Sequence, residues 1–509
     1  MFIILIINYL YLFIILRYLC TIDNYNNFDK SSYGLTKFMK NENNYSLCDI
    51  NVFYFIQKYC KGNCAFVGIW RGGLSIWAKA NMNVNNKLYL LDTFEKGFNN
   101  DDFKQFYFPT KNEVLKNFQS FYVNTNNVNI IKGDCKYTTK NINDKLNLIY
   151  IDVDFYNETM NSLVGLYDLL NVNGVCGIDD YNVNFFDAKK AVDLFFKWHG
   201  IKSYNKINEY AIYWIKKKPK LLKNCNINLI YNFFCVYNIS STRWNMTSAH
   251  ILEMIFNYYN FSEKIINFTQ DIQKNIGINK TIFGIKKEIN NDNINLEYYF
   301  YGWEYKKPGN LDNLFNNSRN VNNFNKIFYK YFNKTISIIK KNCIIYSIDI
   351  IDNNVNDLTH LYCYKENEKN ILDENSSLIN YEYNNKTNEL VIESESFTYT
   401  TKNTNFEDII IPALKKLGIN NFTQIKFFYK NSKYFAFLNK YIKKKIGIYY
   451  HCINIDSFIV FLKIAGFKND FIEYFNAFKT RLEHLSFEIA LDYDINIQSF
   501  TRFAFYGSY

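Results

Sequence analysis

The spacing of apolar segments in this chain changes once, close to residue 219, and this change limits the domain organisation that the sequence can support. Up to about residue 215, short strand-like runs alternate with helical segments, as in parallel α/β sheets. After the charged stretch 216–220, paired runs joined by Asn/Asp turns predict hairpins. The 509 residues also exceed the ~250–300 that one core usually holds. We therefore expect two domains, at residues 33–218 and 225–509.

The first domain is predicted to be a doubly wound, Rossmann-like α/β sheet. Helices are expected between successive strands, at residues 74–80, 113–121, 158–170 and 188–198. The expected strands are residues 64–68, 87–92, 129–132, 146–152, 174–179 and 211–216. Such sheets bind their ligands beyond the carboxyl ends of the strands, so the residues at those ends are the candidate site.

The second domain is predicted to be α+β with antiparallel hairpins. The paired runs are 282–289 with 294–301, 344–350 with 359–364, 378–383 with 389–400, and 487–493 with 501–506. Helical stretches are expected at 311–331, 406–417 and 455–485. Repeated helix–hairpin units could close a barrel. In this order of elements the second half of the chain resembles the aromatic prenyltransferases, but it shares no motif with them. The alternative is a domain of unknown function without chemistry of its own.

The charge of the chain does not indicate a nucleic-acid partner. The formal net charge is +11, but no basic run is longer than three lysines, as at 216–218 and 443–445. Lysines on solvated faces account for this excess. The eleven cysteines are scattered and contain no C-x-x-C pair, which favours reduced thiols in a cytosol-like compartment over a disulfide framework.

Residues 1–20 are the most hydrophobic part of the chain. Their uninterrupted apolar stretch ends at Arg17 and includes Asn8, so it is shorter than the ~20 residues that span a bilayer. It also lacks the basic start and small-residue cleavage site of a signal peptide. Two readings stay open, a hydrophobic leader or a membrane anchor, and an anchor followed by basic residues would keep the rest of the chain in the cytoplasm.

The first two strand ends carry residues suited to an adenosine cofactor. Gly68 and Gly72 lie in a strand-to-helix turn, where glycine allows close approach of a ligand and the helix N-terminus offers free N–H groups. Asp92 ends the next strand and could accept the two ribose hydroxyls; capping a helix is its alternative role. Asp134 follows the third strand, where an adenine amino group could be met.

Carboxylates gather at the next two strand ends. Asp152 and Asp154 follow one strand, and Asp179 and Asp180 follow the next. Carboxylates that converge on one sheet edge repel one another unless a proton or cation is shared. Oxygen ligands of this kind suit Mg²⁺, which keeps open positions for substrate oxygens. The alternative is that these aspartates only cap the helices that follow their strands.

The segments GIWRGG, LLDTF, IDVDFYNETMNSL and GIDDYN, in this order and spacing, resemble the macrocin O-methyltransferase (TylF-type) family, over about residues 33–215. The resemblance implies an enzyme that methylates a sugar hydroxyl with S-adenosylmethionine (SAM) and Mg²⁺. It implies SAM binding by Gly68, Gly72, Asp92 and Asp134, and metal binding by Asp152, Asp179 and Asp180. Asp152, Asp154 and His199 are the candidate catalytic residues, with a structural role as the alternative for His199.

The chain departs from the family pattern at Phe66, where the family usually has an acidic residue two positions before the first glycine. One SAM contact, to the methionine amino group, is therefore not expected. The family's substrate-side segment does not align with residues 1–32, so the acceptor is expected only to be a sugar-like, polyol or glycan hydroxyl. Two other functions stay open: an inactive SAM-fold module for binding or scaffolding, and a bifunctional protein with a separate activity in the C-terminal half. The sequence does not indicate an oligomeric state.

Overall fold

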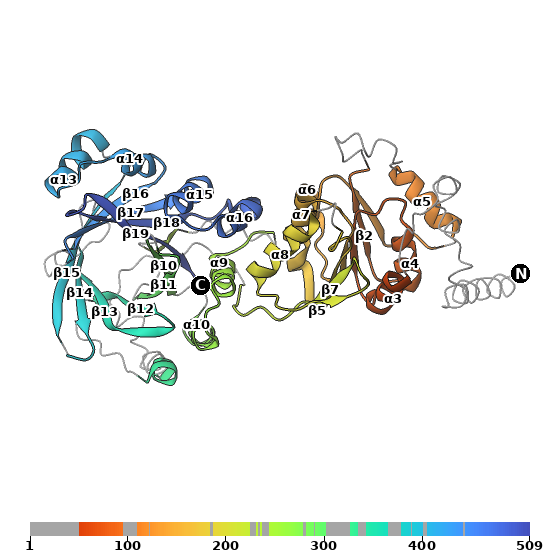
Figure 1. Ribbon diagram of the computed structural model, residues 1–509, viewed down its shortest axis with the longest axis horizontal. Coiled ribbons are helices and arrows are strands. Elements are labelled where there is room, and N and C mark those ends of the chain that lie inside the picture. The colour runs from red at the N-terminus through yellow and green to blue at the C-terminus, as the bar shows by residue number, and fades with distance from the viewer. Residues whose placement is uncertain are drawn as a thin grey trace, which may run out of the picture. The chain divides into compact units, whose positions relative to one another are not determined.

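The computed structural model divides into two compact units, one formed by residues up to 197 with 201–218 and the other by 198–200 with 219–509 (Figure 1). The division falls at Pro219, where the apolar pattern of the sequence changes. The structure describes residues 50–94, 109–121, 123–183, 187–223, 231–232, 235–236, 244–277, 281–289, 291–301, 326–333, 343–364, 378–387, 389–400, 405–440 and 443–509. The leader or anchor expected at residues 1–20 lies outside them. No helix in these ranges is long and apolar enough to cross a membrane.

The first unit is a seven-stranded sheet with the strand order β3-β2-β1-β4-β5-β7-β6. The strands β1 to β5 are parallel, and β7 runs antiparallel to both β5 and β6. The bounds are β1 Cys64–Val67, β2 Leu88–Asp92, β3 Val128–Lys132, β4 Leu146–Ile151, β5 Leu170–Ile178, β6 Asn205–Lys206 and β7 Ile212–Ile215. This order confirms the predicted doubly wound sheet.

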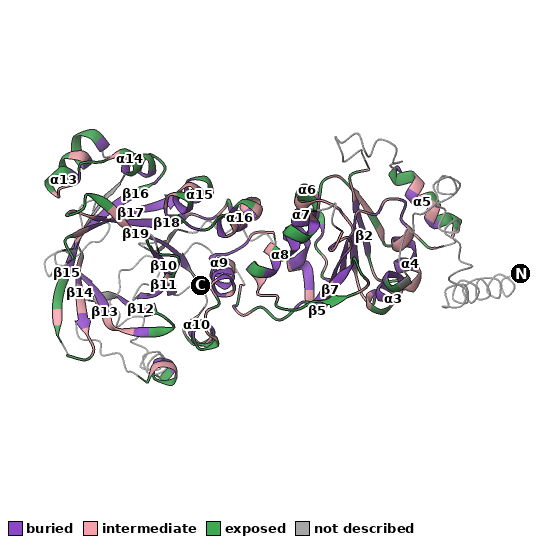
Figure 2. Cartoon of the chain, in the orientation of Figure 1, coloured by how far each residue is buried: buried purple, intermediate pink, exposed green. Residues whose placement is uncertain are grey.

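The helices of the first unit lie between the strands in sequence. They are α3 Ile50–Tyr59, α4 Gly73–Asn81, α5 Lys111–Ser120, α6 Cys135–Thr138, α7 Tyr156–Leu166 and α8 Ala188–His199. The start of α5 is fixed by a capping box, in which Thr110 and Glu113 satisfy each other's backbone N–H groups. The central strands are buried on both faces (Figure 2), as expected of a parallel sheet covered by helices.

The second unit contains a closed barrel of ten described strands, all antiparallel, from β10 to β19. Each strand pairs with the next, and β19 returns to pair with β10. The bounds are β10 Thr281–Glu288, β11 Ile294–Tyr301, β12 Cys343–Ile351, β13 Asn354–Tyr364, β14 Leu378–Asn384, β15 Leu390–Thr400, β16 Tyr434–Lys440, β17 Lys445–Ile453, β18 Phe487–Asp494 and β19 Ser499–Ser508. The predicted α+β domain with hairpins is confirmed, and its hairpins close.

Helices surround this barrel (Figure 1). They are α9 Ser248–Tyr258, α10 Glu263–Asn275, α13 Ile411–Lys416, α14 Thr423–Lys430, α15 Ile455–Ile464, α16 Asn469–Ala477 and α17 Lys479–Leu482, with a π-helical turn at Phe406–Ile410 and the short strands β8 Tyr231–Asn232 and β9 Cys235–Val236. Their aromatic side chains pack on the outer faces of the strands; Phe458, for example, stacks on Phe487 with ring centroids 4.2 Å apart. One face of each strand is thereby left for the barrel interior.

Three details of the second unit correct the sequence prediction. The hairpin β16–β17 was not expected, because its turn contains the lysines at 443–445 instead of the Asn or Asp residues that mark a turn in the sequence. The predicted helix 455–485 is three helices, broken where Gly466 adopts a φ of 67°, a left-handed conformation that ends a helix. Strand β13 begins at Asn354 instead of Thr359, since Asp352 and Asn353 form a tight turn with positive φ.

The cysteines agree with the expected reduced state. Among the described residues, Cys60, Cys64, Cys135, Cys176, Cys363 and Cys452 form no disulfide. Burial raises the pKa of the Cys60 thiol to about 11, which keeps it protonated and unreactive at neutral pH.

The peptide between the two units should be the first site of cleavage by trypsin. Lys217, Lys218 and Pro219 are exposed, whereas Lys216 is buried and donates to the carbonyl oxygens of Tyr167 and Leu170. After the linker, the backbone N–H of Lys220 donates a hydrogen bond to the Glu253 carboxylate. Because the bond after Lys218 precedes proline, we expect cleavage after Lys217, giving two stable fragments by gel electrophoresis and mass spectrometry.

The variant Lys217→Gln should slow this cleavage, and Lys190→Gln, at an exposed lysine of α8, should leave the pattern unchanged. Early cleavage within residues 109–215, before any cut at the linker, would show that the boundary is misplaced.

Candidate functional site in the first unit

The turn between β1 and α4 depends on two glycines. Gly68 has a φ of 74°, and a Cβ atom there would lie 1.8 Å from the carbonyl oxygen of Asp152. Gly72 has a φ of 87° and immediately precedes α4. Any side chain at position 68 would therefore separate the ends of β1 and β4. The turn leads from β1 directly into the N-terminus of α4, where the sequence predicts cofactor binding.

Asp92, at the end of β2, holds this turn in place. One of its carboxylate oxygens, Oδ2, accepts hydrogen bonds from the backbone N–H groups of Ile69 (3.0 Å) and Trp70 (3.1 Å). The other oxygen accepts from the N–H of Phe94 at 2.9 Å. These contacts fill three of the roughly four lone-pair positions of a carboxylate. The sequence identified Asp92 as a ribose acceptor but did not indicate this second role.

Asp134 lies at the next strand end, after Gly133, and is exposed. Its side chain accepts a hydrogen bond from the backbone N–H of Lys136 at 2.7 Å and so caps the short helix α6. This is the ordinary role of an aspartate at that position. The structure therefore gives Asp134 a local function whether or not it contacts a ligand.

The strand ends of β1, β4 and β5 lie side by side, which brings the predicted aspartates to one edge of the sheet. The backbone N–H of Asp152 donates to the carbonyl oxygen of Val67 at 2.9 Å, and that of Asp179 donates to Ile151 at 2.8 Å. Asp180 follows with a φ of 52°, which turns the chain sharply after β5.

Three of the four aspartates, Asp152, Asp154 and Asp180, have raised pKa values, which shows a shortage of compensating charge. Burial and the neighbouring charges of Asp179, Asp180 and Asp154 raise the pKa of Asp152 well above its ordinary value. Burial, the charge of Asp154 and a hydrogen bond shared by these two side chains raise the pKa of Asp180 to about 7. The largest charge effects on Asp152 all come from other carboxylates. This is the electrostatic pattern of a site that a proton or a cation would stabilise.

Tyr150 is a site residue that the sequence analysis did not identify. Its hydroxyl donates to Asp179 at 3.0 Å, and its ring lies beside that of Phe66, with centroids 5.9 Å apart. Phe66 is buried in the core of the first unit, where the family usually has an acidic residue. The only sequence signal for Tyr150 is its place in β4, two residues before Asp152.

The carboxylate oxygens of Asp152, Asp179 and Asp180 are not gathered into one compact ligand set. In the described part of the chain, groups of three possible ligand atoms within 4.8 Å of one another occur at Glu297, Asp349 and His360, and at His360, Glu382 and Glu393. All of these lie in the second unit. A metal ion bound at the strand ends of the first unit would therefore require rotations of the aspartate side chains.

The structure does not bring His199 to the strand-end aspartates. It is the last residue of α8, whose first residue, Ala188, bonds through its N–H to the carbonyl oxygen of Asp154. The twelve residues of α8 make a helix of about 18 Å. His199 is grouped with the second unit, and its ring lies near that of Phe478, with centroids 6.3 Å apart.

Comparison with known proteins identifies one matching family and several similar structures. Residues 50–216 match the model of the macrocin O-methyltransferase (TylF) family, which is about a third of the chain. Among solved structures, the O-methyltransferase NovP is 22% identical, covers 35% of this chain and 84% of its own, and has a TM-score of 0.31. CalS11, a TDP-rhamnose 3'-O-methyltransferase of calicheamicin biosynthesis, is 16% identical, covers 32% and 76%, and has a TM-score of 0.26.

One curated protein matches most of the chain. The "Putative JmjC domain-containing protein L887" of Acanthamoeba polyphaga mimivirus is 24% identical over 470 residues, which is 85% of this chain and 70% of that protein. A match of this length includes residues of both units.

The raised pKa of Asp180 should make the stability of the first unit depend on pH. The native state holds this proton more tightly than the unfolded chain, whose carboxyl has the ordinary pKa of 3.8. The resulting stability is present at low pH and is lost as the pH rises from about 4 through about 7. In the presence of a chelator, we expect the unfolding temperature of the first unit to fall between pH 5 and pH 8 by scanning calorimetry.

Asp180→Asn should flatten this dependence, since asparagine tolerates the positive φ and does not titrate. The matched variant Asp144→Asn, which changes a carboxylate before β4 at the opposite edge of the sheet, should keep the wild-type slope. Equal slopes in wild type and Asp180→Asn would contradict the assignment.

Proposed function

We propose that residues 50–216 form a SAM-dependent O-methyltransferase that uses Mg²⁺ to methylate a hydroxyl of a sugar-like, polyol or glycan acceptor. The observation that carries this proposal is the placement of four carboxylates beside a glycine turn, at the carboxyl edge of a doubly wound sheet. The family match over the same residues supports methyl transfer. Since SAM is a cytosolic cofactor and the described cysteines form no disulfides, we place the protein in the cytoplasm.

SAM would bind across the first strand ends. Gly68 and Gly72, both with positive φ, shape the turn, and the N-terminus of α4 would offer N–H groups to the carboxylate of the methionine moiety. Asp92 keeps one lone-pair position for a ribose hydroxyl while its other contacts hold the turn. Asp134 would meet the adenine, although its capping bond already occupies one oxygen.

The donor set at β4 and β5 fits a hard divalent cation. Asp152, Asp179 and Asp180 offer carboxylate oxygens, which Mg²⁺ prefers, and the raised pKa values of Asp152 and Asp180 mean that a cation would stabilise their ionised forms. When bound, the ion would make the acceptor hydroxyl more acidic. Tyr150 would hold one oxygen of Asp179 in place through its 3.0 Å hydrogen bond.

Asp154 would accept the proton of the acceptor hydroxyl. It lies outside the proposed metal ligands and shares a hydrogen bond with Asp180, and burial raises its pKa above the ordinary value, which makes a carboxylate a better base near neutral pH. His199 is too far along α8 to take this role. Most of the rate enhancement would come from alignment of the acceptor oxygen with the methyl group.

The alternative is a module that binds SAM without transferring its methyl group. Under this alternative, the chain would bind SAM, but substitution of the aspartates after β4 and β5 would change no reaction, because none takes place. Cation binding at these aspartates and its link to methyl transfer separate the two functions.

Asp92 should be required for SAM binding by the full chain. In Asp92→Ala, the ribose acceptor and the bonds that hold the turn are both lost, so calorimetry should show affinity reduced about tenfold or more, in line with the ~1.5–3 kcal/mol of a hydrogen bond to a charged group. Asp144→Asn should bind SAM as the wild type does, and thermal unfolding should show both variants folded. Unchanged affinity in Asp92→Ala would remove Asp92 from the site.

Asp179 should be required for metal binding but not for SAM binding. Calorimetry with Mg²⁺ should show one site in the first unit that is lost in Asp179→Asn, with SAM affinity within about threefold of wild type, because the metal and cofactor use different strand ends. Transfer of labelled methyl groups from SAM to a panel of sugar acceptors should stop in Asp179→Asn and in excess chelator. Full transfer with chelator present would exclude a metal-assisted reaction.

A further inference from the structure

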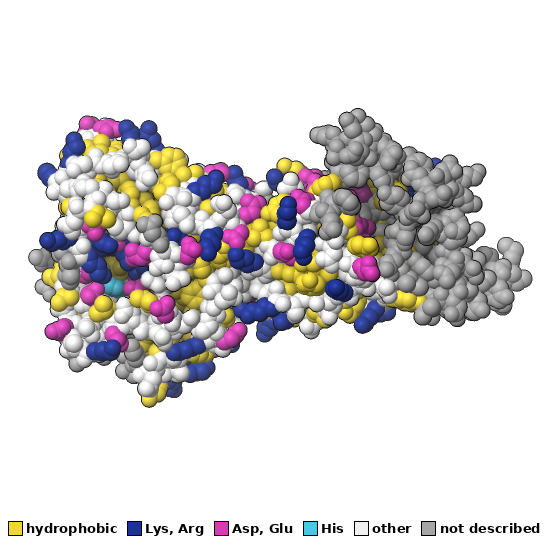
Figure 3. Space-filling model, viewed as in Figure 1, with side chains coloured by type: hydrophobic (Ala, Val, Ile, Leu, Met, Phe, Trp, Pro, Cys, Tyr) yellow, Lys and Arg dark blue, Asp and Glu magenta, His cyan; other side chains and the backbone are white. Residues whose placement is uncertain are grey.

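The barrel of the second unit encloses a polar cavity that the proposed methyl transfer does not use. The cavity has a water-accessible volume of about 40 Å³, enough for more than one water molecule. In the space-filling view, basic and acidic side chains gather around a hollow over the barrel (Figure 3). Its lining includes Lys286, Asp349, Glu393, Lys440 and Arg502.

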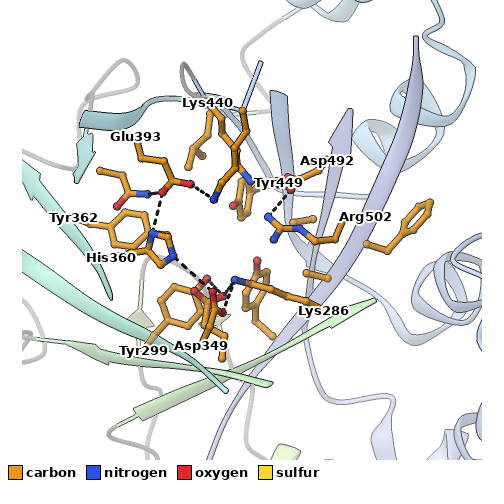
Figure 4. A pocket seen from close by; sticks show the side chains of 18 residues that line it. Lys286, Tyr299, Asp349, His360, Tyr362, Glu393, Lys440, Tyr449, Asp492 and Arg502 are labelled. Atoms are coloured by element: carbon orange, nitrogen blue, oxygen red, sulfur yellow. Dashed lines mark hydrogen bonds and ion pairs between the residues drawn. The ribbon is translucent and has the colours of Figure 1, made fainter. Parts of the chain in front are cut away.

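The cavity is polar because alternate residues of the strands face inward. Lys440 is on β16, Asp492 on β18, and Arg502 on β19 directly opposite Asp492. Their side chains point toward one another across the interior (Figure 4). Side chains just fill an eight-stranded barrel, whereas wider barrels leave space for a ligand; with ten strands, this barrel is of the wider kind.

On one side of the cavity, cations and carboxylates satisfy each other. Glu297 and Asp349 lie opposite each other on β11 and β12, and the ammonium group of Lys286 joins them at 2.7 and 2.8 Å. His360 lies 2.9 Å from Glu393, and the nearby carboxylates raise the pKa of this histidine to about 9. The Lys286 ammonium already occupies the place that a metal ion would take between Glu297 and Asp349.

On the other side, positive charge is in excess. Lys440 and Arg502 share a single carboxylate, that of Asp492, which lies 2.7 and 2.9 Å from the Lys440 ammonium. Among the described residues, Asp492 is the one ion-pair partner of Arg502, whose guanidinium group has five N–H donors. Burial and the charge of Arg502 lower the pKa of Lys440. A second anion at this point would relieve the repulsion between the two cations.

Two further features of the same cavity point to a ligand. The rings of Tyr299, Tyr449 and Tyr506 form one wall, with centroids 5.6 Å apart for Tyr299 and Tyr506 and 6.3 Å for Tyr449 and Tyr506. Asn380 is 4% exposed, and its Oδ1 has no hydrogen-bond partner among the residues that the structure describes. Its Nδ2 donates to Glu393 at 2.6 Å, which fixes the free oxygen as an acceptor.

We infer that the barrel interior is a second ligand site, for a small organic anion whose phosphate or carboxylate group binds Arg502 and Lys440 and whose aromatic body lies on the tyrosine rings. Arginine suits such groups because its fork of donors matches two acceptor oxygens. The free Oδ1 of Asn380 would accept a hydrogen bond from a hydroxyl or N–H group of the ligand. This site does not depend on methyl transfer in the first unit.

A purely structural network explains the interior less well. Buried ion pairs are often less stabilising than apolar side chains of the same volume, and two cations on one carboxylate and a buried acceptor without a partner each cost the fold stability. Both occur here, and both face the same cavity.

Calorimetry on the full chain with inorganic phosphate, phenyl phosphate and benzoate tests the inference. We expect phenyl phosphate or benzoate to bind with one site per chain and more tightly than inorganic phosphate, because the tyrosine wall contacts only the aromatic probes. Tighter binding of phenyl phosphate assigns the natural ligand to the phosphates, and tighter binding of benzoate assigns it to the carboxylates. Failure of all three probes to bind would overturn the inference.

Variants then locate the binding. Arg502→Gln and Lys440→Gln should each weaken the better aromatic probe by about tenfold or more, while each leaves Asp492 with one cation. Lys479→Gln, which removes a lysine exposed on α17, should bind as the wild type does. If thermal unfolding shows that the glutamine variants are not folded, Arg502→Lys keeps the charge but loses the paired donors, and should also bind more weakly. Equal affinity in wild type and the folded cavity variants would place the probes elsewhere and overturn the inference.

Discussion

The close approach of the ends of β1 and β4 is the constraint on which the site of the first unit depends. At Gly68 there is no room for a Cβ atom, because the carbonyl oxygen of Asp152 would lie 1.8 Å away. This contact places the glycine turn between β1 and α4 beside Asp152. Asp92 then fixes the turn from the other side through the N–H groups of Ile69 and Trp70. Two strand ends and one glycine thus set the geometry that a cofactor and a metal would share.

The sequence predicts this unit well because the relevant signals are local. A parallel strand buried on both faces appears as a short apolar run, and the first polar residue after it marks the sheet edge. Asp92, Asp152 and Asp179 were found in this way. The pattern could not show that Asp92 bonds to the turn, since residues 69 and 70 are far from it in sequence. It also could not identify Tyr150, whose hydroxyl reaches Asp179 from within an apolar strand.

In the second unit, the hairpins were easier to predict than the interior of the barrel. Each pair of strands has its own turn signal, although the lysines at 443–445 concealed the turn before β17. Closure by β10 and β19 joins residues more than 200 positions apart, and no local pattern carries that information. Charged residues such as Lys440 and Asp492 resemble ordinary solvent-facing positions of a half-buried strand. These polar faces of the strands line a cavity only because the barrel closes.

The two units therefore differ in the charge that their candidate sites would attract. At the strand ends of the first unit, carboxylates lie together and the pKa values of Asp152 and Asp180 rise, so the site attracts a proton or a cation. In the barrel, lysines, an arginine and a histidine hold the pKa values of Glu393 and Asp492 below their usual range, so those carboxylates stay ionised at neutral pH. Because Asp492 is already shared by Lys440 and Arg502, it cannot neutralise both. An anion from solution can, and the walls that would receive it are aromatic, which favours an organic anion over a hydrated inorganic ion.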